Sequence, residues 1–401
     1  MKTNLGQDML YLNECGVLCA LGDSHSKITA KLLAQAQSGI AMTDAWSPGR
    51  MLPLGQVNNA LPALDGWPLQ LRSRNNALAL AALAQIRRAV DAVIARYGAD
   101  RVGVVVGTST SGVSATEYAM RYRNGNGVLP DDFHYAQQEM GSLSAILARE
   151  LDIGGPAYVH SSACSSSAKA MASAARLINM GLCDAVLCGG ADSLCEFTVA
   201  GFSALDSVSA ARCNPLSVNR DGINIGEGAA LFLMTREPAT VGLRGWGESS
   251  DGHHMSSPDP AGGGARVAIA EALRRAGLDA AQIDYINLHG TATPQNDAME
   301  SRVVADMFGA DVAVSSTKPF TGHALGAAAA LEAAFCWLAM QDDNPDGILP
   351  PHLWDGVADP DLPQLNVVAP GGRLGRPLQF ALSNSFAFGG SNATLIFGRA
   401  G

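Results

Sequence analysis

The chain has 401 residues, of which 47% are hydrophobic and 16% are charged, and its formal net charge is −10. This composition supplies a large apolar core and excludes a disordered chain, which would be poor in apolar residues and rich in charge. The acidic balance argues against nucleic-acid binding, because that affinity comes from Lys and Arg on phosphates. No window approaches ~20 uninterrupted apolar residues, so no membrane span is expected, and the polar N-terminus does not resemble a signal peptide.

Short β-branched runs alternate with long segments rich in Ala and Leu. In chain order, the expected elements are a helix at 75–97, a strand at 101–107, a helix at 165–180, strands at 185–189 and 230–234, a helix at 265–276, a strand at 285–288, a helix at 324–340 and a strand at 394–397. Continuous apolar strands between helices are typical of sheets covered on both faces, which predicts the α/β class.

Two segments near the middle of the chain suggest a join. Segment 236–247 and the Pro- and Gly-rich segment 256–264 favour two halves, at 1–240 and 241–401. Segment 342–372, rich in Pro and Asp, is expected to be a surface excursion.

Eight cysteines are spread over the chain. Cys15 and Cys19 form a C-x3-C pair without a second pair or a nearby His, so a zinc site is not expected. Without a signal peptide, reduced thiols in the cytoplasm are the natural interpretation, and most of them are expected to be buried. His253 and His254 also lack a third ligand at a sensible spacing, and we expect them to line an entrance.

Cys164 lies in a more informative setting than the other cysteines. A strand-like run beginning at residue 157 ends in small residues, a helix is expected to follow, and Cys164 falls at the turn between them. We expect the positive end of the helix dipole to lower its pKa and favour the thiolate. Its backbone N–H would point into the same space and serve an oxyanion. Taken alone, Cys164 is as consistent with a buried structural thiol as with a nucleophile.

Two histidines lie on Gly-rich turns. His289 follows an expected strand in the sequence HGTATP, and His323 precedes an expected helix in the sequence KPFTGH. A single His is more often structural or exposed, but two in such similar settings, with a candidate nucleophile upstream, favour a site. A neutral imidazole whose Nε2 carries the proton can donate to a thioester carbonyl as negative charge develops there.

Together these motifs resemble the β-ketoacyl-acyl carrier protein synthases, of the elongating types I and II. The resemblance rests on Cys164, HGTATP at 289–294, the pattern Lys318-x-x-x-Gly-His323 and NSFAFGGSN at 384–392, with further matches at 214–215, 220–222 and 226–228. It implies the thiolase fold, in which two duplicated α/β halves form a five-layer αβαβα sandwich. Cys164 would come from the first half and both histidines from the second.

The resemblance also implies a two-stage reaction. Cys164 would take an acyl group from a carrier thioester; a malonyl-carrier thioester would then lose CO2, and its enolate would attack the acyl-Cys carbonyl to give a β-ketoacyl carrier. His289 and His323 would hold the enolate, and the backbone N–H groups of Cys164 and Phe388 would form the oxyanion hole. No cofactor is implied, because the phosphopantetheine arm arrives on the acyl carrier protein.

Further roles follow from the same resemblance. Lys318 and Glu332 would support His323, although an ordinary ion pair is the alternative. Thr291 and Thr293 match positions that bond the phosphopantetheine arm, although threonines also cap backbone. Phe388 matches an aromatic gate, and substrate contact is expected of Phe388 and Phe202. No catalytic metal is expected, but a set of positions matches a structural monovalent cation site of some members: Asn287, Glu300, Glu332, Asn384 and Ser385.

Three positions depart from the family pattern. Ala387 replaces a usual Gly and should stiffen the gate loop, Leu216 stands where an aromatic residue is common, and Asp206 stands where relatives often carry a basic residue that docks the carrier. Docking to an acidic carrier should therefore use a local basic patch. The candidates, which solvated arginines would equally explain, are Arg72, Arg74, Arg121 and Arg123.

These departures resemble synthases of secondary pathways, such as bacterial aryl polyene clusters, so fatty acid, polyketide and aryl polyene elongation all stay open. The expected partners are an acyl carrier protein and a second ketosynthase chain, either an identical copy or a chain-length-factor-like subunit. A non-condensing chain-length factor or decarboxylase subunit is the main alternative, but such subunits typically lose the nucleophile. A thiolase would need a second Cys near the C-terminus, whereas the last is Cys336. An initiating synthase would pair its Cys with one His and an Asn, and a non-enzymatic binding protein stays open.

Overall fold

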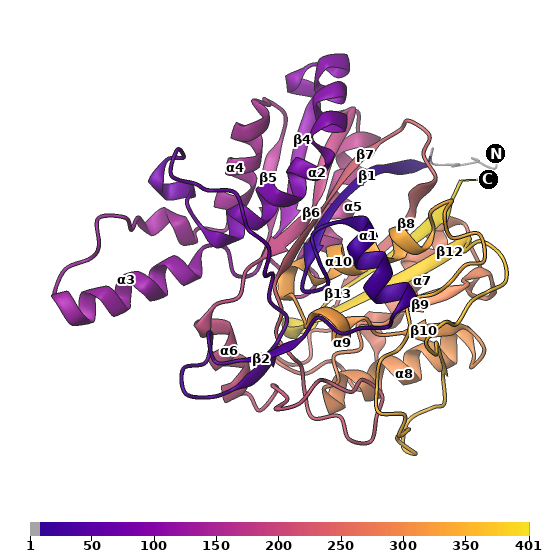
Figure 1. Cartoon of the computed structure of the whole chain (residues 1–401). Helices are drawn as coiled ribbons and strands as arrows, with labels where there is room; N and C mark the ends of the chain where they lie inside the picture. The colour runs from indigo at the N-terminus through magenta and orange to yellow at the C-terminus, as the bar shows by residue number, and fades with distance from the viewer. Residues whose placement is uncertain (1–8, 401) are drawn as a thin grey trace.

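The computed structural model describes residues 9–400. Its main strands form one continuous hydrogen-bonded order of eleven strands, which divides into two groups (Figure 1). Each group is called a sheet below. The first group comprises β1 (Leu10–Cys19), β4 (Val102–Gly107), β5 (Ala157–His160), β6 (Ala185–Asp192) and β7 (Gly228–Thr235). The second comprises β8 (Val241–Ser250), β9 (Tyr285–Asn287), β10 (Ala313–Ser315), β11 (Asn366–Val367), β12 (Phe380–Ala387) and β13 (Ser391–Arg399).

The two groups repeat the same strand order. The first runs β5-β4-β6-β7-β1 and the second runs β10-β9-β12-β13-β8, with β11 added outside β10. In each group the first three strands of this order are parallel, and the remaining pairings are antiparallel. The groups touch as strands where Leu10 and Tyr11 of β1 pair with Leu243 and Gly242 of β8. This internal duplication is the thiolase fold that the resemblance implied.

Helices cover both sheets and fill the space between them (Figure 1). On the first sheet lie α2 (Arg74–Tyr97) and α4 (Ser142–Leu151), on the second lies α7 (Gly263–Ala276) with α8 (Pro294–Phe308) beside it, and between the sheets lie α5 (Ser166–Asn179) and α10 (Ala328–Ala339). The result is five layers, αβαβα. The remaining helices are α1 (His25–Thr29), α3 (Val113–Asn126), α6 (Glu196–Ala204) and α9 (Lys318–Thr321), and β2 (Ala41–Thr43) pairs with β3 (Leu52–Leu54) as an antiparallel hairpin. Single turns are η1 (Ala30–Ala34), η2 (Leu69–Leu71), η3 (Ala99–Arg101), η4 (Tyr135–Gln138), η5 (Ala280–Gln282), η6 (Leu325–Ala327) and η7 (Phe388–Gly390).

Successive side chains of a strand pack into different hydrophobic cores, one on each face of the sheet. In β7, Leu231 and Leu233 pack in the same cluster as α2, whereas Phe232 and Met234 pack in the cluster that contains α5 and α10. Successive side chains of a strand point to opposite faces, so a fully apolar strand serves both layers. Every residue of the Ala-rich α10 is buried, because small side chains let it fit between two sheets. Within residues 9–400, no helix is both long enough and apolar enough to cross a bilayer.

The expected elements all appear in the structure. Segment 236–247, predicted to join the two halves, begins after β7 ends at Thr235 and runs into β8, which starts at Val241. Much of 236–247 belongs to β8, which pairs along most of its length with β13. Its glycines have a packing reason: a Cβ on Gly245 or Gly247 would overlap the backbone oxygen of Ala272 or Ala268 in α7. Glycine inside a strand often marks such a close approach of another backbone. The helix expected from 324 starts with the turn η6, and α10 itself begins at Ala328.

Substitution of Gly247 tests this close packing. Gly247→Ala places a methyl group against the α7 backbone, so we expect a loss of about 2–3 kcal/mol in the free energy of unfolding, measured by urea denaturation. Gly125, in the exposed helix α3, has nothing within 4 Å of its would-be Cβ, so Gly125→Ala should instead gain about 0.5–1 kcal/mol. Equal effects at the two positions would contradict this account of β8.

Candidate active site

Cys164 lies in a tight turn between β5 and α5. It precedes the first residue of the helix, Ser166, by two positions, and the residue before it, Ala163, has φ of 49°. A non-glycine residue in this left-handed region is strained, and such strain is concentrated at functional sites. The turn is pressed against β4, because a Cβ on Gly107 would overlap the backbone of Ser166 and Ser167. The sheet thus fixes the position of the thiol.

His289 is held by a carboxylate from the following helix. Glu300 of α8 accepts hydrogen bonds from the backbone N–H groups of His289 and Gly290, both at 2.8 Å. Asp297, one turn earlier, accepts from the N–H of Ala292 at 3.2 Å. The pKa of Glu300 is raised to about 7, because the effect of burial is larger than the opposing effect of the N–H groups that donate to the carboxylate. The loop after β9 is therefore fastened to α8 rather than free.

His323 is held by the extended segment at 224–226. Its N–H donates to the carbonyl of Asn224 at 2.6 Å, and its carbonyl accepts from the N–H of Gly226 at 3.0 Å. Gly322, directly before it, has φ of 72°, and a Cβ there would approach the carbonyl oxygen of Ile225 to 2.8 Å. Only glycine combines this backbone conformation with such an approach.

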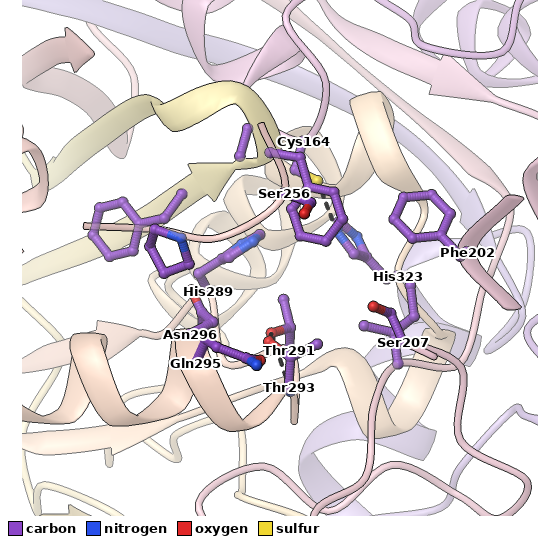
Figure 2. Close-up of a pocket in the computed structure, with 15 residues that line it drawn as sticks. Cys164, Phe202, Ser207, Ser256, His289, Thr291, Thr293, Gln295, Asn296 and His323 are labelled. Carbon is purple, nitrogen blue, oxygen red and sulfur yellow. Dashed lines mark hydrogen bonds between the residues drawn. The ribbon is translucent and has the colours of Figure 1, made fainter. Parts of the chain in front are cut away.

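The three side chains meet in one pocket (Figure 2). Nε2 of His323 lies 3.0 Å from Sγ of Cys164. The rings of His289 and His323 stand almost perpendicular, with their centroids 5.4 Å apart. Cys164, from the first half of the fold, and two histidines more than 120 positions further along the chain, from the second half, therefore surround one small space.

A buried ion pair lies behind the histidines. Lys318 Nζ bonds the carboxylate of Glu332 and lies 3.4 Å from Nδ1 of His289. A lysine ammonium can only donate, so Nδ1 of His289 accepts and the ring proton sits on Nε2, which faces the pocket as a donor. Lys318 thus contacts His289, whereas the resemblance placed it beside His323. Nδ1 of His323 is buried and has no hydrogen-bond partner within residues 9–400.

Burial and the Lys318 charge keep both imidazoles neutral. Desolvation, followed by repulsion from Lys318, holds the pKa of His289 and of His323 well below the usual value of 6.5. A neutral imidazole can donate from Nε2 at neutral pH without carrying a charge. The spacing of Cys164, His289 and His323 would also suit a metal ion. However, a proton on Nε2 of His289 makes that nitrogen a donor rather than a ligand.

The prediction of a lowered thiol pKa was wrong for the free enzyme. Burial raises the pKa of Cys164 to about 11. The charge of Lys318 and the backbone N–H groups of Phe388 and Cys164 act in the opposite direction, but they do not offset the loss of water around the sulfur. Cys164 does lie at the start of a helix, as expected. The sequence did not show how deeply its thiol is buried.

The same contacts place two backbone donors beside the sulfur. The backbone N–H groups of Phe388 and Cys164 both lower the pKa of the Cys164 thiol, so both donors lie near Sγ. Donors near the attacking sulfur are also near the oxygen of a thioester that it attacks, which is where an oxyanion forms. Phe388 begins the turn η7, in which Gly389 and Gly390 have φ of 80° and 72°. Ala387 has φ of −92° and ψ of 154°, an ordinary extended conformation, so this backbone accepts Ala at a position where the family usually has Gly.

The pocket wall includes expected and unexpected residues. Thr291, Thr293, Phe202 and Phe388 line it; the threonine hydroxyls lie 2.9 Å apart, and the two aromatic rings are 5.6 Å apart at their centroids. Ala387, which the sequence analysis named as a departure from the family pattern, also lines it. The remaining lining residues were not singled out from the sequence: Ser207, Ile223, Ser256, Pro258, Gln295, Asn296 and Phe386. Some of these could have been found from the sequence because they lie in a family motif or directly after one. Gln295 and Asn296 follow HGTATP, and Phe386 lies within NSFAFGGSN.

The structure does not bring the expected docking arginines to the pocket wall. The guanidinium of Arg74 is paired at 2.5 Å with the fully buried Glu227, and Arg72 donates to the carbonyls of Trp67 and Asp65. Arg121 pairs with Glu196 on the surface, and Arg123 is exposed. Docking of the carrier by this set stays a prediction. Arg74 also neutralises the buried carboxylate of Glu227.

The positions matched to a monovalent cation site have mixed surroundings. Asn384 donates to Glu300 at 3.2 Å, but Asn287 donates to Tyr285 and Thr317, and Glu332 binds Lys318. Ser385 is buried. Both oxygens of Glu300 already accept N–H groups. Among the described residues, two oxygens of the set are buried without a hydrogen-bond partner, Oδ1 of Asn287 and Oε2 of Glu332. Glu332 is already paired with Lys318, so the set does not fit a cation site. His253 and His254 are exposed and do not line the pocket wall.

The fold and the site agree with the comparisons. The family model of the β-ketoacyl synthase N-terminal domain matches residues 56–239, and that of the C-terminal domain matches residues 241–353. The chain therefore belongs to the β-ketoacyl synthase family, and it is an acyltransferase that makes β-ketoacyl thioesters. The interpretation as a non-condensing subunit is not favoured.

Three relatives illustrate the similarity. Nodulation protein E of Rhizobium meliloti is 32% identical over 397 residues, which cover 95% of this chain and 97% of that protein. The 3-oxoacyl-[acyl-carrier-protein] synthase 2 of Synechocystis sp. is 32% identical over 325 residues, or 76% of each chain. The ketosynthase ApeO of Xenorhabdus doucetiae, solved in complex with its chain length factor ApeC, gives a TM-score of 0.91 and 44% identity over the whole of both chains.

The raised thiol pKa predicts how Cys164 reacts in the free enzyme. Because the thiolate is the reactive form, its alkylation by iodoacetamide should accelerate about tenfold per pH unit between pH 7 and 9. Mass spectrometry of the labelled peptide measures this rate, and Cys164→Ala gives the background from the other seven cysteines. A plateau below pH 8 would show instead a thiol of lowered pKa.

Proposed function

We propose that Cys164 carries the growing acyl chain and that His289 and His323 stabilise the enolate of the malonyl extender. The observation that carries this proposal is the convergence of a thiol, two neutral imidazoles and two backbone N–H groups on one pocket. Lys318 and Glu332 form a neutral pair behind the imidazoles. We propose that Lys318 fixes the His289 tautomer and that Glu332 balances its charge.

The first stage is acyl transfer. The sulfur of Cys164 attacks the carbonyl carbon of an acyl-carrier thioester, and the N–H groups of Cys164 and Phe388 stabilise the tetrahedral oxyanion. The C–S bond to the carrier then breaks. The proton lost by Cys164 ends on the thiol of the departing carrier arm, so the step is balanced. Thr291 and Thr293, at the pocket wall, are placed to bond the arm of the carrier.

The second stage is decarboxylation followed by condensation. The carboxylate of the malonyl thioester leaves as CO2, and its bonding electrons form an enolate whose oxygen accepts hydrogen bonds from Nε2 of His289 and His323. The enolate carbon attacks the acyl-Cys carbonyl, and the new C–C bond forms as the bond to sulfur breaks. The sulfur takes a proton from solvent. Neutral donors suit this step, because they stabilise the developing charge without protonating the carbon.

We further propose that the chain works with a chain-length-factor-like ketosynthase subunit on aryl-primed or polyunsaturated acyl chains carried by an acyl carrier protein. The support is the 44% identity, over both whole chains, to a ketosynthase solved with its chain length factor, together with the sequence departures described above. A homodimer that extends fatty acids is the second candidate, favoured by the Synechocystis relative. We place the reaction in the cytoplasm, in keeping with eight free cysteines, and propose that no resident cofactor takes part.

Substitution of the histidines separates the two stages. His289→Ala and His323→Ala should each lower malonyl-carrier decarboxylation by at least about 100-fold, because each removes one donor to the enolate. Acylation of Cys164 should persist at a reduced rate in both variants. Release of CO2 and mass spectrometry of the acyl-enzyme measure the two stages, and His134→Ala, at an exposed histidine outside the pocket, is the control. Decarboxylation that survives the loss of both histidines would contradict their assignment.

The partner and substrate proposals need one reconstitution. The chain is incubated with malonyl-carrier and a panel of saturated, polyunsaturated and aryl-primed acyl carriers, alone and co-purified with a chain-length-factor-like subunit. We expect multiple elongations of aryl or polyene primers only in the presence of that subunit, as read by mass spectrometry of the carrier. Equal elongation of saturated primers by the chain alone would support the homodimer instead. Cys164→Ala should be inactive in every arm.

A further inference from the structure

A row of hydrogen-bonding side chains joins the helix of the nucleophile to the loop that carries Phe388. Lys169 of α5 lies 2.6 Å, from Nζ, from the hydroxyl of Ser391. That hydroxyl is 3.0 Å from the hydroxyl of Ser165, which in turn donates to the carbonyl of Ser162 at 2.9 Å. Ser165 directly follows the nucleophile, and Ser391 directly follows the turn η7.

The direction of this row is fixed by its ends. Lys169 can only donate, so Ser391 accepts from it, and the proton of Ser165 is directed at the carbonyl of Ser162. Ser391 must therefore donate to Ser165. Each hydroxyl in the row thus accepts one hydrogen bond and donates one, and the row starts at the Lys169 ammonium.

Lys169 has no other charged partner in the part of the chain that the structure describes. It makes no ion pair there, and its half-buried ammonium donates a hydrogen bond to the hydroxyl of Ser391. Burial, helped by the nearby Arg176, lowers its pKa. Partial burial of an ammonium without a carboxylate costs free energy unless the group is hydrogen-bonded. The bond to Ser391 supplies that hydrogen bond, which points to a role for this contact.

The contacts of Ser391 connect the turn η7 to α5. Gly389 and Gly390 give the turn freedom at two consecutive residues with positive φ, and its other hydrogen bonds run to the segment at 251–255. The contacts of Ser391 are the ones that tie it to α5. Ser391 also pairs with Ala387 of β12 and with Ser250 of β8, but those pairings hold the turn to the second sheet and not to the helix that follows Cys164.

We propose that Lys169 is a positioning residue, which holds the Phe388 N–H against the nucleophile through Ser391 and Ser165. The inference rests on the proposed oxyanion role of Phe388. It predicts a selective defect, because acyl transfer uses that N–H whereas malonyl decarboxylation uses the two imidazoles.

Lys169→Met should slow acylation of Cys164 about tenfold, less than the ~10²–10³ expected when an oxyanion donor is lost outright. Decarboxylation of malonyl-carrier should change by less than about twofold. Lys169→Arg keeps a cationic donor and should restore most of the acylation rate. Arg176→Met is the matched control: it removes a cation two turns along the same helix, one that pairs with Glu248 instead, and should acylate at the wild-type rate.

Ser391→Ala repeats the test without changing a charge, should Lys169→Met fail to fold, and we expect the same selective loss. Wild-type acylation in Lys169→Met or Ser391→Ala would overturn the inference. Equal slowing of both stages, matched by Arg176→Met, would also overturn it, because that result indicates general destabilisation. Failure of the proposed function itself gives a different result: the wild-type enzyme would then not be acylated at Cys164.

Discussion

The site depends on the close fit of α5 and α10 between two sheets. Glycines in β4 and β6 allow it: a Cβ on Gly107 or Gly190 would collide with the start of α5. The N–H of Ala330 in α10 donates to the hydroxyl of Ser167 in α5 at 2.9 Å, so the two helices also touch each other. Cys164 precedes α5 and His323 precedes α10, each after the third strand of its half. The duplicated architecture therefore delivers the nucleophile and one histidine to the same point from equivalent positions.

Exclusion of water then sets the charge states. The same burial that raises the pKa of the thiol lowers the pKa of both imidazoles. Lys318 and Glu332 enter this environment as a pair, which keeps the layer behind the histidines close to neutral. Hydrogen-bond donors in such a place need no reorganisation when a negative charge forms, and in a medium of low polarity they act more strongly than in water.

The sequence predicted the chemistry of the site better than its energetics. Cys164, His289 and His323 were found because each sits in a short motif of small residues. The pKa direction of Cys164 was missed, because burial arises from packing partners that are remote in the sequence. The glycines of β8 were read only as part of a possible join, whereas Gly245 and Gly247 also allow the close contact with α7. The link from Lys169 to Ser391 spans 222 positions, and no local pattern announces it.

The resting state of the nucleophile has a further consequence for durability. Oxidants and other electrophiles attack the sulfur anion, and peroxide converts it to sulfenic and then to irreversible sulfinic and sulfonic acids. A thiol whose pKa burial raises to about 11 is almost wholly protonated at neutral pH. Between turnovers the enzyme therefore offers such reagents very little of the reactive form, and its chemical lifetime benefits from the same dry pocket that condensation requires.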